Sequence, residues 1–322
     1  VKAKNKEMFQ LVFDKTPFYA ESGGQAGDSG TIESKSGERI TILTTIKEND
    51  LPIHIAERIP LNLEETFIAK VDEERRIEIA NNHTATHLLH NALRSVLGNH
   101  IEQKGSSVGS ISFRFDFSHY EKVSREHLRE VEKLVNSLIR KNIAREEFRN
   151  IRVEKAHEMG AIALFGEKYG VEVRVIRFGD STELCGGTHV TRTGDIGAMV
   201  LLSESASSAG VRRIEALTGR HARKHANDTM AMAKTAASEL RTTVDDMPAR
   251  IAALMEERKK LERDLSEARR KLAMGGGGNG AQAAGGVREV GNVKLMARAV
   301  AGVETKDLKS LVDDGKKQIG SG

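Results

Sequence analysis

Apolar residues recur with helical spacing in three stretches of the chain. Over 82–97 the spacing of three and four residues is carried by Leu88, Leu89, Ala92, Leu93 and Val96. The same pattern predicts an amphipathic helix over about 124–142 and a shorter helix over about 154–164 that ends at Gly166. We therefore expect three helices ahead of the C-terminal third.

Strands are expected between these helices, where apolar and polar residues alternate or short apolar runs occur. The stretches concerned are 9–13, 40–42, 111–117, 171–175 and 196–202. Residues 1–75 are β-rich on this interpretation. Because helices and strands mix without a βαβ rhythm, we expect an α+β fold with an antiparallel sheet.

Three further stretches are interpreted as loops. Residues 101–106 break the pattern, and 205–213 form a run of small residues that ends in Arg212 and Arg213. Four glycines fall within the fifteen residues of 16–30. That stretch is either a hairpin connection or a loop whose backbone N–H groups approach a ligand closely, and composition leaves both open.

The character of the chain changes near residue 220. Apolar residues then follow a spacing of three and four, interrupted by Arg258, which predicts a helical hairpin arm or short coiled coil with Pro248 at a helix start or break. A glycine-rich linker follows, and a strand-then-helix pattern comes after it. The expected domains are 1–75, β-rich with the glycine loop; 76–219, α/β; 220–274, the arm; 275–286, the linker; and 287–322, part of a further α/β domain.

Two pairs of residues carry the candidate chemistry. His83 and His87 lie one turn apart on one face of the first predicted helix, and Cys185 and His189 flank two glycines that allow a tight turn. A histidine pair alone is often a polar stripe, and a lone cysteine is usually a small buried hydrophobe. Together, three imidazoles and one thiolate are a good ligand set for zinc.

Composition narrows the class of protein. The 322 residues are 39% hydrophobic, 4% aromatic and 30% charged, which suits two or more helix-rich domains. The single cysteine excludes an internal disulfide and is consistent with a reducing, cytoplasmic compartment. No membrane span or signal peptide is visible. A net charge of +4 is compatible with RNA without arguing for it. Because the chain begins at Val1, we expect a piece of a longer protein.

Four motifs together resemble the editing domain of the alanyl-tRNA synthetase family. They are FYAESGGQ at 18–25, HTATHLL at 83–89, CGGTH at 185–189 and RRIEA at 212–216, and the likeness covers about residues 9–219. The arm, the linker and the segment from 287 look like that synthetase's helical linker and the start of its C-terminal tRNA-binding domain. The editing domain of threonyl-tRNA synthetases shares the His and Cys pairs, but the glycine loop argues against it.

The resemblance implies an aminoacyl-tRNA hydrolase that releases serine or glycine from mischarged tRNA(Ala), with the aminoacylated 3′ end of that tRNA as partner. The ATP-dependent aminoacylation core is expected to lie outside this chain. Two alternatives remain: a free-standing hydrolase acting in trans, and a non-catalytic, zinc-stabilised tRNA-binding module. A homodimer through the arm or the C-terminal domain is left open.

The resemblance also assigns roles to residues. It implies one zinc ion held by His83, His87, Cys185 and His189. It implies recognition of the serine hydroxyl by Thr86, a place for Gln103 near the editing pocket, and selection of the amino acid by Gly23, Gly24, Gln25 and Asp28. The candidates for contact with tRNA are Arg212, Arg213 and Lys104.

Four protein ligands close a zinc site, which leaves no open position for a hydroxide. We therefore expect zinc to position the terminal ribose and ester, with hydrolysis by an oriented water whose general base the sequence does not identify. His90 falls on the same helix face as His83 and His87 and is expected to lie behind the ligands or in solvent.

Overall fold

The computed structural model describes residues 2–3, 6–163, 170–275, 287–291, 293–297 and 305–320. The chain divides into two compact units, Val1–Asp228 and Thr229–Gly322, which are described separately below. Helix α4, Gly219–Glu239, runs across that division. Within the described residues, no helix is long and apolar enough to cross a membrane.

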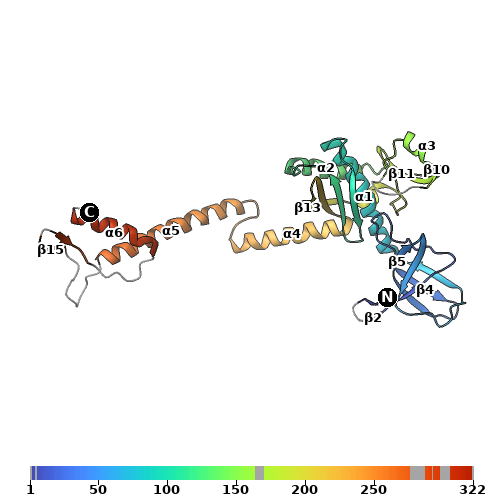
Figure 1. Cartoon of the computed structure of the whole chain (residues 1–322), viewed down its shortest axis with the longest axis horizontal. Coiled ribbons are helices and arrows are strands. Elements are labelled where there is room, and N and C mark those ends of the chain that lie inside the picture. Colours follow the sequence, from blue (N-terminus) through green and yellow to red (C-terminus); the bar gives the residue numbers. More distant parts are fainter. Residues whose placement is uncertain are drawn as a thin grey trace. The chain divides into compact units, whose positions relative to one another are not determined.

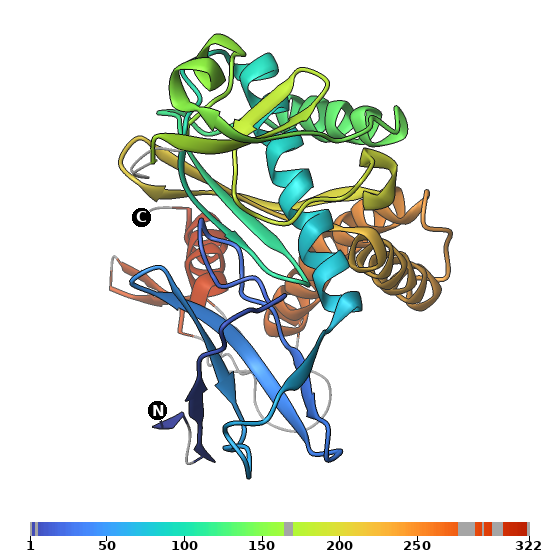
Figure 2. The same cartoon turned by 90° about the vertical axis from the view of Figure 1, so that its right-hand side faces the viewer.

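The first unit begins with a five-stranded antiparallel sheet in the order β3-β6-β5-β4-β7, drawn in blue in Figures 1 and 2. Its strands are β3 Phe9–Leu11, β4 Gly30–Ser34, β5 Arg39–Glu48, β6 Leu51–Ala56 and β7 Phe67–Val71, preceded by the short pair β1 Lys2–Ala3 and β2 Lys6–Glu7. A small core fills it, made of Leu11, Phe18, Ile32, Ile40, Ile42 and Ala56. The prediction that 1–75 is β-rich is confirmed.

Helix α1, Glu73–Leu97, leads from this sheet into the second part of the unit (Figure 2). The side chain of Asp72 caps it by accepting from the backbone N–H of Arg75, which satisfies one of the free donors of the first turn. Helix α2, Arg125–Arg140, packs beside α1. Both helices lie against a four-stranded antiparallel sheet in the order β13-β14-β9-β8. Its strands are β8 Gln103–Val108, β9 Phe113–Ser118, β13 Met199–Ser208 and β14 Val211–Thr218.

The main hydrophobic core lies between this sheet and the two helices. Phe113, Phe115 and Phe117 occupy every second position along β9 and are at most 1% exposed. The side chains predicted from the period of two to share one face of the strand therefore face the core. They meet Leu88 and Leu89 of α1 within one cluster. Because the apolar side chains of the helix and of the sheet are buried against each other, α1 has a fixed position against the sheet.

A second, three-stranded antiparallel sheet completes the unit in the order β10-β11-β12. Its strands are β10 Glu146–Arg152, β11 Glu172–Phe178 and β12 Ser181–Leu184, and the short helix α3, Val153–Glu158, packs against β10 and β11. The 3₁₀ turn Thr193–Ile196 joins this sheet to β13. All named strands pair antiparallel, which confirms the predicted α+β class.

Two predicted loops are wrong. Residues 103–108 form strand β8, which pairs with β9 although its sequence is polar, because backbone pairing on an edge of the sheet does not require apolar side chains. Residues 205–213 form a hairpin in which β13 and β14 pair as far as Ser208 and Val211, with Gly210 at φ 71° in the turn. Helix α3 ends at Glu158, before the predicted 164. The predicted end at Gly166 lies outside the described residues.

The second unit contains helix α5, Met247–Gly275, with Pro248 in its first turn, as the sequence indicates. The arm residues Ile251, Leu261 and Leu265 are 44%, 59% and 52% exposed. After it come β15 Arg288–Val290, β16 Val293–Leu295 and α6 Thr305–Ile319, which confirms the strand-then-helix pattern. The predicted linker lies outside the described residues from 276 to 286.

Candidate metal centre

Helix α1 places His83 and His87 on the face that is covered by the rest of the unit. The two residues are four positions apart, their ring centroids lie 5.2 Å from each other, and both are buried, at 6% and 3% exposed. The helical spacing of the apolar residues in this stretch favours an α-helix, and the fold then buries His83 and His87 on the same face. A pair of imidazoles enclosed in this way requires partners.

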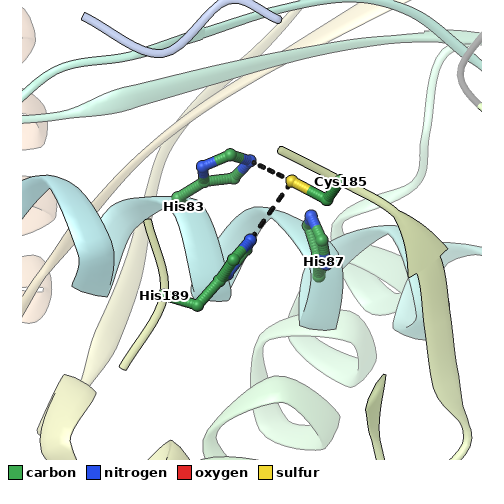
Figure 3. Close-up of side chains that lie close together, drawn as sticks. All are labelled: His83, His87, Cys185 and His189. Atoms are coloured by element: carbon green, nitrogen blue, oxygen red, sulfur yellow. Dashed lines mark hydrogen bonds between the residues drawn. The ribbon is translucent and has the colours of Figure 1, made fainter. Parts of the chain in front are cut away.

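Those partners come from the chain that follows strand β12. Cys185 Sγ lies 3.4 Å from Nε2 of His83 and 3.2 Å from Nε2 of His189 (Figure 3). One ligand atom from each of the four residues His83, His87, Cys185 and His189 falls within 4.8 Å of the other three. Segments about a hundred residues apart in sequence therefore meet in one buried cluster.

The turn depends on a glycine because the chain passes directly over His83. A Cβ at Gly187 would overlap the ring of His83 and lie 2.6 Å from Oε1 of Gln25. At Gly186 a Cβ would meet nothing within 4 Å. Arg174 of β11 secures the turn from the other side, where its guanidinium donates to the carbonyl oxygens of Cys185 and Gly187 at 3.1 and 2.6 Å.

Gln25 connects the glycine loop to this turn. Its Oε1 lies 2.6 Å from Nδ1 of His83 and accepts from the backbone N–H of Thr188 at 2.9 Å, while its Nε2 donates to the Thr188 hydroxyl at 2.9 Å. Gln25 is fully buried. The contact to His83 leaves Nε2 of that ring directed at the cysteine, so the loop fixes both the tautomer and the orientation of one ligand.

The loop itself is anchored on the edge of the four-stranded sheet. Ala26 N donates to Val108 O at 2.9 Å, and Val108 N donates to Gly24 O at 2.8 Å. Gly24 has φ 79°, and a Cβ there would lie 2.5 Å from the carbonyl oxygen of Ser106. The interpretation of 16–30 as a hairpin connection is wrong, because β3 and β4 are not neighbours in the sheet. The loop closely approaches the turn at Thr188 and strand β8, and its approach to a ligand stays a prediction.

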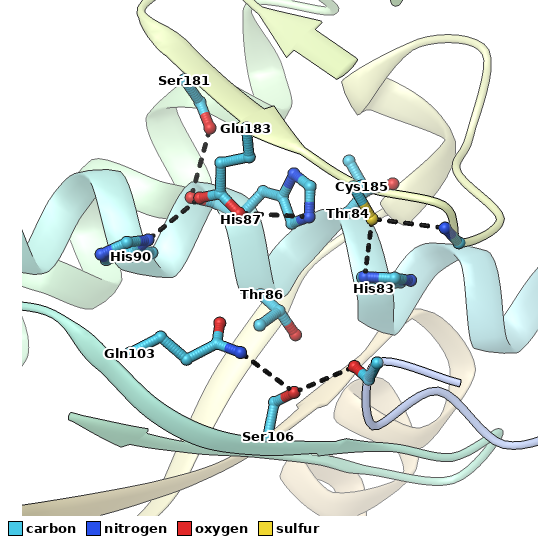
Figure 4. Close-up of polar contacts among 12 residues, drawn as sticks. His83, Thr84, Thr86, His87, His90, Gln103, Ser106, Ser181, Glu183 and Cys185 are labelled. Atoms are coloured by element: carbon cyan, nitrogen blue, oxygen red, sulfur yellow. Dashed lines mark hydrogen bonds and ion pairs between the residues drawn. The ribbon is translucent and has the colours of Figure 1, made fainter. Parts of the chain in front are cut away.

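The other two histidines also have a second contact. Thr84 Oγ1 lies 3.1 Å from Nδ1 of His189. Glu183, in β12, places Oε2 3.3 Å from Nε2 of His87 and Oε1 3.0 Å from Nδ1 of His90 (Figure 4). His90 thus lies behind the cluster and not in solvent, which is one of the two positions expected for it from the sequence.

Burial controls the charge of the cluster. It lowers the pKa of His83 and of His189 well below the ordinary value, and the neighbouring imidazoles lower both further. Burial also lowers the pKa of His87, against the opposing effect of Glu183. Burial alone would raise the pKa of Glu183, but His87 and His90 bring it below its usual range. Neutral imidazoles beside a carboxylate are the protonation states that a metal ion requires.

The donor set and its spacing fit zinc. Ligands at the zinc–nitrogen and zinc–sulfur bond lengths stand about 3.3–3.8 Å apart in a tetrahedron. Of the two Sγ–Nε2 separations, 3.4 Å falls within that range and 3.2 Å lies just below it. All ligand atoms lie within 4.8 Å of one another, so the set would have to contract by at most about 1 Å around an ion. Three nitrogens and a thiolate favour zinc over magnesium or calcium, which prefer oxygen. The identity of the ion remains a prediction.

Thr86 and Gln103 lie across from each other. Thr86 projects from α1 toward β8, where Gln103 and Ser106 are located (Figure 4). Its hydroxyl donates to the carbonyl oxygen of Asn82 at 2.9 Å. Gln103 Nε2 lies 3.4 Å from Ser106 Oγ, which in turn lies 3.4 Å from the carbonyl oxygen of Gly23. The predicted selectivity residues of helix, strand and glycine loop thus border one another.

Asp28 has a different setting from the other motif residues. Its carboxylate accepts from the backbone N–H of Tyr19 at 2.6 Å and pairs with the guanidinium of Arg76 at the start of α1. The side chain is 1% exposed. These contacts of Asp28 join the glycine loop to the helix that carries the histidines and so stabilise the fold. The role of Asp28 in amino-acid selection stays a prediction.

The candidate tRNA contacts are paired with carboxylates inside the unit. Arg212 Nε donates to Glu204 at 2.6 Å, Arg213 binds both oxygens of Asp116 at 2.7 and 2.9 Å, and Lys104 lies 2.9 Å from Glu102. The role of these three residues in binding tRNA stays a prediction.

Glu183 and Arg174 were not singled out from the sequence. For Glu183, its place two residues before the cysteine was a visible signal.

Two family models match parts of the chain. Residues 173–215 match the model described as threonyl and alanyl tRNA synthetase second additional domain, and residues 1–75 match the model described as tRNA synthetases class II (A). The first covers the turn that supplies Cys185 and His189.

Curated relatives match nearly the whole chain. An alanine–tRNA ligase of Bradyrhizobium diazoefficiens is 56% identical over 99% of this chain, one of Rhodopseudomonas palustris 54% identical over 99%, and one of Nitrobacter winogradskyi 53% identical over 99%. The match covers 37%, 37% and 38% of the length of these relatives. The chain therefore spans little more than a third of them.

Proposed function

The chain belongs to the alanyl-tRNA synthetase family, and from that premise we propose that it carries an editing site which hydrolyses the ester of Ser-tRNA(Ala) and Gly-tRNA(Ala). The observation that supports this most is the buried cluster of His83, His87, Cys185 and His189 beside the polar group of Thr86, Gln103 and the glycine loop. A metal-binding group next to hydroxyl and amide side chains suits an ester with a small polar amino acid.

A second site has a physical rationale. An aminoacylation pocket fitted to alanine cannot exclude the smaller glycine, and it rejects the extra hydroxyl of serine by only about 1–3 kcal/mol. A separate site that accepts serine and glycine and disfavours alanine corrects the error by hydrolysis.

Thr86 is proposed to recognise serine as an acceptor. Because its own O–H donates to Asn82, the oxygen keeps a lone pair for the hydroxyl of a seryl group. The methyl of alanine has no donor for that lone pair, so a buried acceptor would be left unpaired in its complex. Glycine has no donor for that lone pair either, so release of glycine is proposed from the family and not from this contact.

The metal ligands are proposed to hold zinc, which when bound would position the terminal ribose and the ester. Gln25 and Thr84 hold the rings of His83 and His189 in place. Gln103 and Ser106 would bind the amino acid or a water on the side of β8. Exclusion of bulk water follows from the burial of the cluster, whose members are at most 8% exposed.

The remainder of the function is proposed from the family. The partner is tRNA(Ala), contacted near Arg212, Arg213 and Lys104, and the ATP-dependent joining of alanine to tRNA is proposed for the part of the relatives that this chain does not span. The domain boundaries 1–75, 76–219, 220–274, 275–286 and 287–322 are retained as proposals, as is a dimer through the arm or the C-terminal domain.

The test is release of serine from Ser-tRNA(Ala), with Ala-tRNA(Ala) as the matched substrate, before and after removal of zinc and after its return. We expect zinc-dependent release of serine with alanine retained. Equal release of serine and alanine would contradict the proposed selectivity for serine. Binding of tRNA by a folded, zinc-loaded chain without any release would favour the alternative of a binding module. An aminoacylation core upstream in the full reading frame would remove the alternative of a free-standing hydrolase.

A further inference from the structure

A carboxylate outside the ligand set lies directly behind the cluster. The side chain of Glu183 is 3% exposed and contacts His87 with one oxygen and His90 with the other, at 3.3 and 3.0 Å (Figure 4). Burial of an isolated carboxylate is strongly unfavourable, so its place requires compensation by positive charge or donors. The two imidazoles supply donors but no fixed charge.

The position of this carboxylate is rigid. Strand β12 is flanked on both edges, by Ile176 of β11 and by Ile162, whose backbone exchanges hydrogen bonds of 2.9 and 3.0 Å with Thr182 and Leu184. Glu183 cannot move away from the helix without breaking this pairing. Its side chain is therefore held against α1 by the backbone.

His90 holds the second oxygen of the carboxylate. Its ring packs at 5.3 Å from Phe115, and its Nε2 is buried without a hydrogen-bond partner among the described residues. Because a carboxylate oxygen only accepts, the Nδ1 that faces Glu183 carries a proton. His90 therefore donates to Glu183, which leaves the other oxygen directed at His87.

The charge of the site explains why a carboxylate is placed there. A doubly charged ion bound by three neutral imidazoles and one thiolate retains one positive charge, which is unfavourable in a buried site. Arg174 adds positive charge at the turn and is balanced by Glu147 at 2.8 Å. Among the described residues, the carboxylate that contacts a cluster histidine is that of Glu183.

We propose that Glu183, supported by His90, is a positioning residue of the metal centre: it fixes the ring of His87 and supplies the negative charge that neutralises the bound ion. This inference rests on the proposed metal site. It differs from a purely structural role, in which Glu183 would join β12 to α1 and metal affinity would not depend on its charge.

The test is the zinc affinity of the whole chain, measured by competition with a chromophoric chelator, for the unaltered chain and for Glu183→Gln. This substitution keeps the shape and removes the charge, and we expect the affinity to fall by about 10–100-fold. Glu204→Gln is the matched control, because Glu204 has an equally buried side chain, 3% exposed, and pairs with Arg212 away from the cluster. Its zinc affinity should stay within about twofold of the unaltered chain.

Two further measurements separate the outcomes. Glu183→Asp retains the charge at a shorter reach and should lose less affinity than Glu183→Gln; an equal or larger loss would overturn the charge argument. The cobalt form of Glu183→Gln should keep its thiolate-to-cobalt absorption band, since the ligands are unchanged. A zinc affinity within twofold in Glu183→Gln, together with a lower melting temperature of the metal-free chain, would overturn the inference and leave the metal site standing. Failure of the unaltered chain to bind zinc would overturn both.

Discussion

The two pairs of candidate ligands have the same spacing in sequence but are positioned by different means. His83 and His87 lie four apart on a continuous helix, where the period of 3.6 residues brings them to one face. Cys185 and His189 also lie four apart, but in a non-repetitive turn after β12. No backbone repeat makes the second pair converge.

The turn pair depends on neighbours from three other segments. Gly187 provides room beside His83, Gln25 holds the backbone at Thr188, and Arg174 binds two carbonyl oxygens of the turn. Single neighbouring substitutions should therefore displace the turn pair, whereas the backbone of α1 keeps His83 and His87 on one face and their neighbours only orient the two rings. The following experiments test that difference.

The largest effect should come from removing a ligand of either pair. For Cys185→Ala and for His87→Ala we expect zinc affinity to fall by more than about 100-fold, beyond the loss typical of residues behind the ligands, and serine release to be abolished. The fold should persist because Cys185 is one small member of a core that is made mostly of larger apolar side chains, and His87 does not belong to that core. Chelator competition, circular dichroism and the release assay measure the three quantities. Unfolding of Cys185→Ala would instead favour a structural zinc.

Gly187→Ala should come next. Its Cβ would overlap His83 and crowd Gln25, so we expect an unfolding free energy lower by about 1–3 kcal/mol and a zinc affinity lower by about tenfold or more. Gly186→Ala is the matched control, because its Cβ meets nothing within 4 Å. Chemical denaturation and zinc competition measure both variants. Equal behaviour of the two would contradict the claim that the turn depends on close packing at 187.

Acid should lower the unfolding free energy of the metal-free chain, because histidines of both pairs take up protons when the chain unfolds. The pKa values of His83, His87 and His189 are lowered by burial from an ordinary value of 6.5, so the unfolded chain takes up protons before the folded chain does. Stability is therefore present above about pH 6.5 and falls below it, by up to about 1.4 kcal/mol per pH unit for each histidine. Denaturation between pH 7.5 and 5 in the absence of metal measures this; a stability that rises on acidification would contradict it.

Gln25→Ala should have a smaller effect that is specific to the metal. Loss of the contact to Nδ1 of His83 frees the ring, and we expect zinc affinity to fall by about tenfold. Gln103→Ala is the control, since its amide contacts Ser106 on the side of β8. In the same zinc competition, Gln103→Ala should bind like the unaltered chain. A larger loss in Gln103→Ala than in Gln25→Ala would reverse the assignment of the two amides.

The smallest effect on the metal is expected for Thr86→Val, a change on α1 between the two ligands. The helix should keep its ligands in place, so zinc affinity should remain within about twofold. Serine release should fall by about tenfold, the value of one lost hydrogen bond near 1.4 kcal/mol, with alanine release unchanged. Separate rates for the two substrates measure this. A loss of zinc affinity would show that the helix pair is less independent than proposed.

Local patterns predicted much of the fold. The helix with the histidines, the strand with alternating phenylalanines and the arm were each recognisable from their periods. The start of α1 at Glu73 was missed because its first turns carry mostly charged residues, although Asp72 is a recognisable cap. Strand β8 and the β13–β14 hairpin were missed because small and polar residues pair through their backbones, and only a neighbouring strand reveals that pairing.

The sequence by itself pointed to the four candidate ligand residues and determined the convergence of His83 and His87, because an α-helix converts a spacing of four residues into a shared face. Only the tertiary structure decided how the turn pair meets them, that Gln25 lies against His83, and that Glu183 stands behind His87. His83 and Gln25 are 58 positions apart in the sequence, and His189 and Thr84 are 105 positions apart. Local periodicity carries no information about such distances, whereas burial of the shared core fixes them.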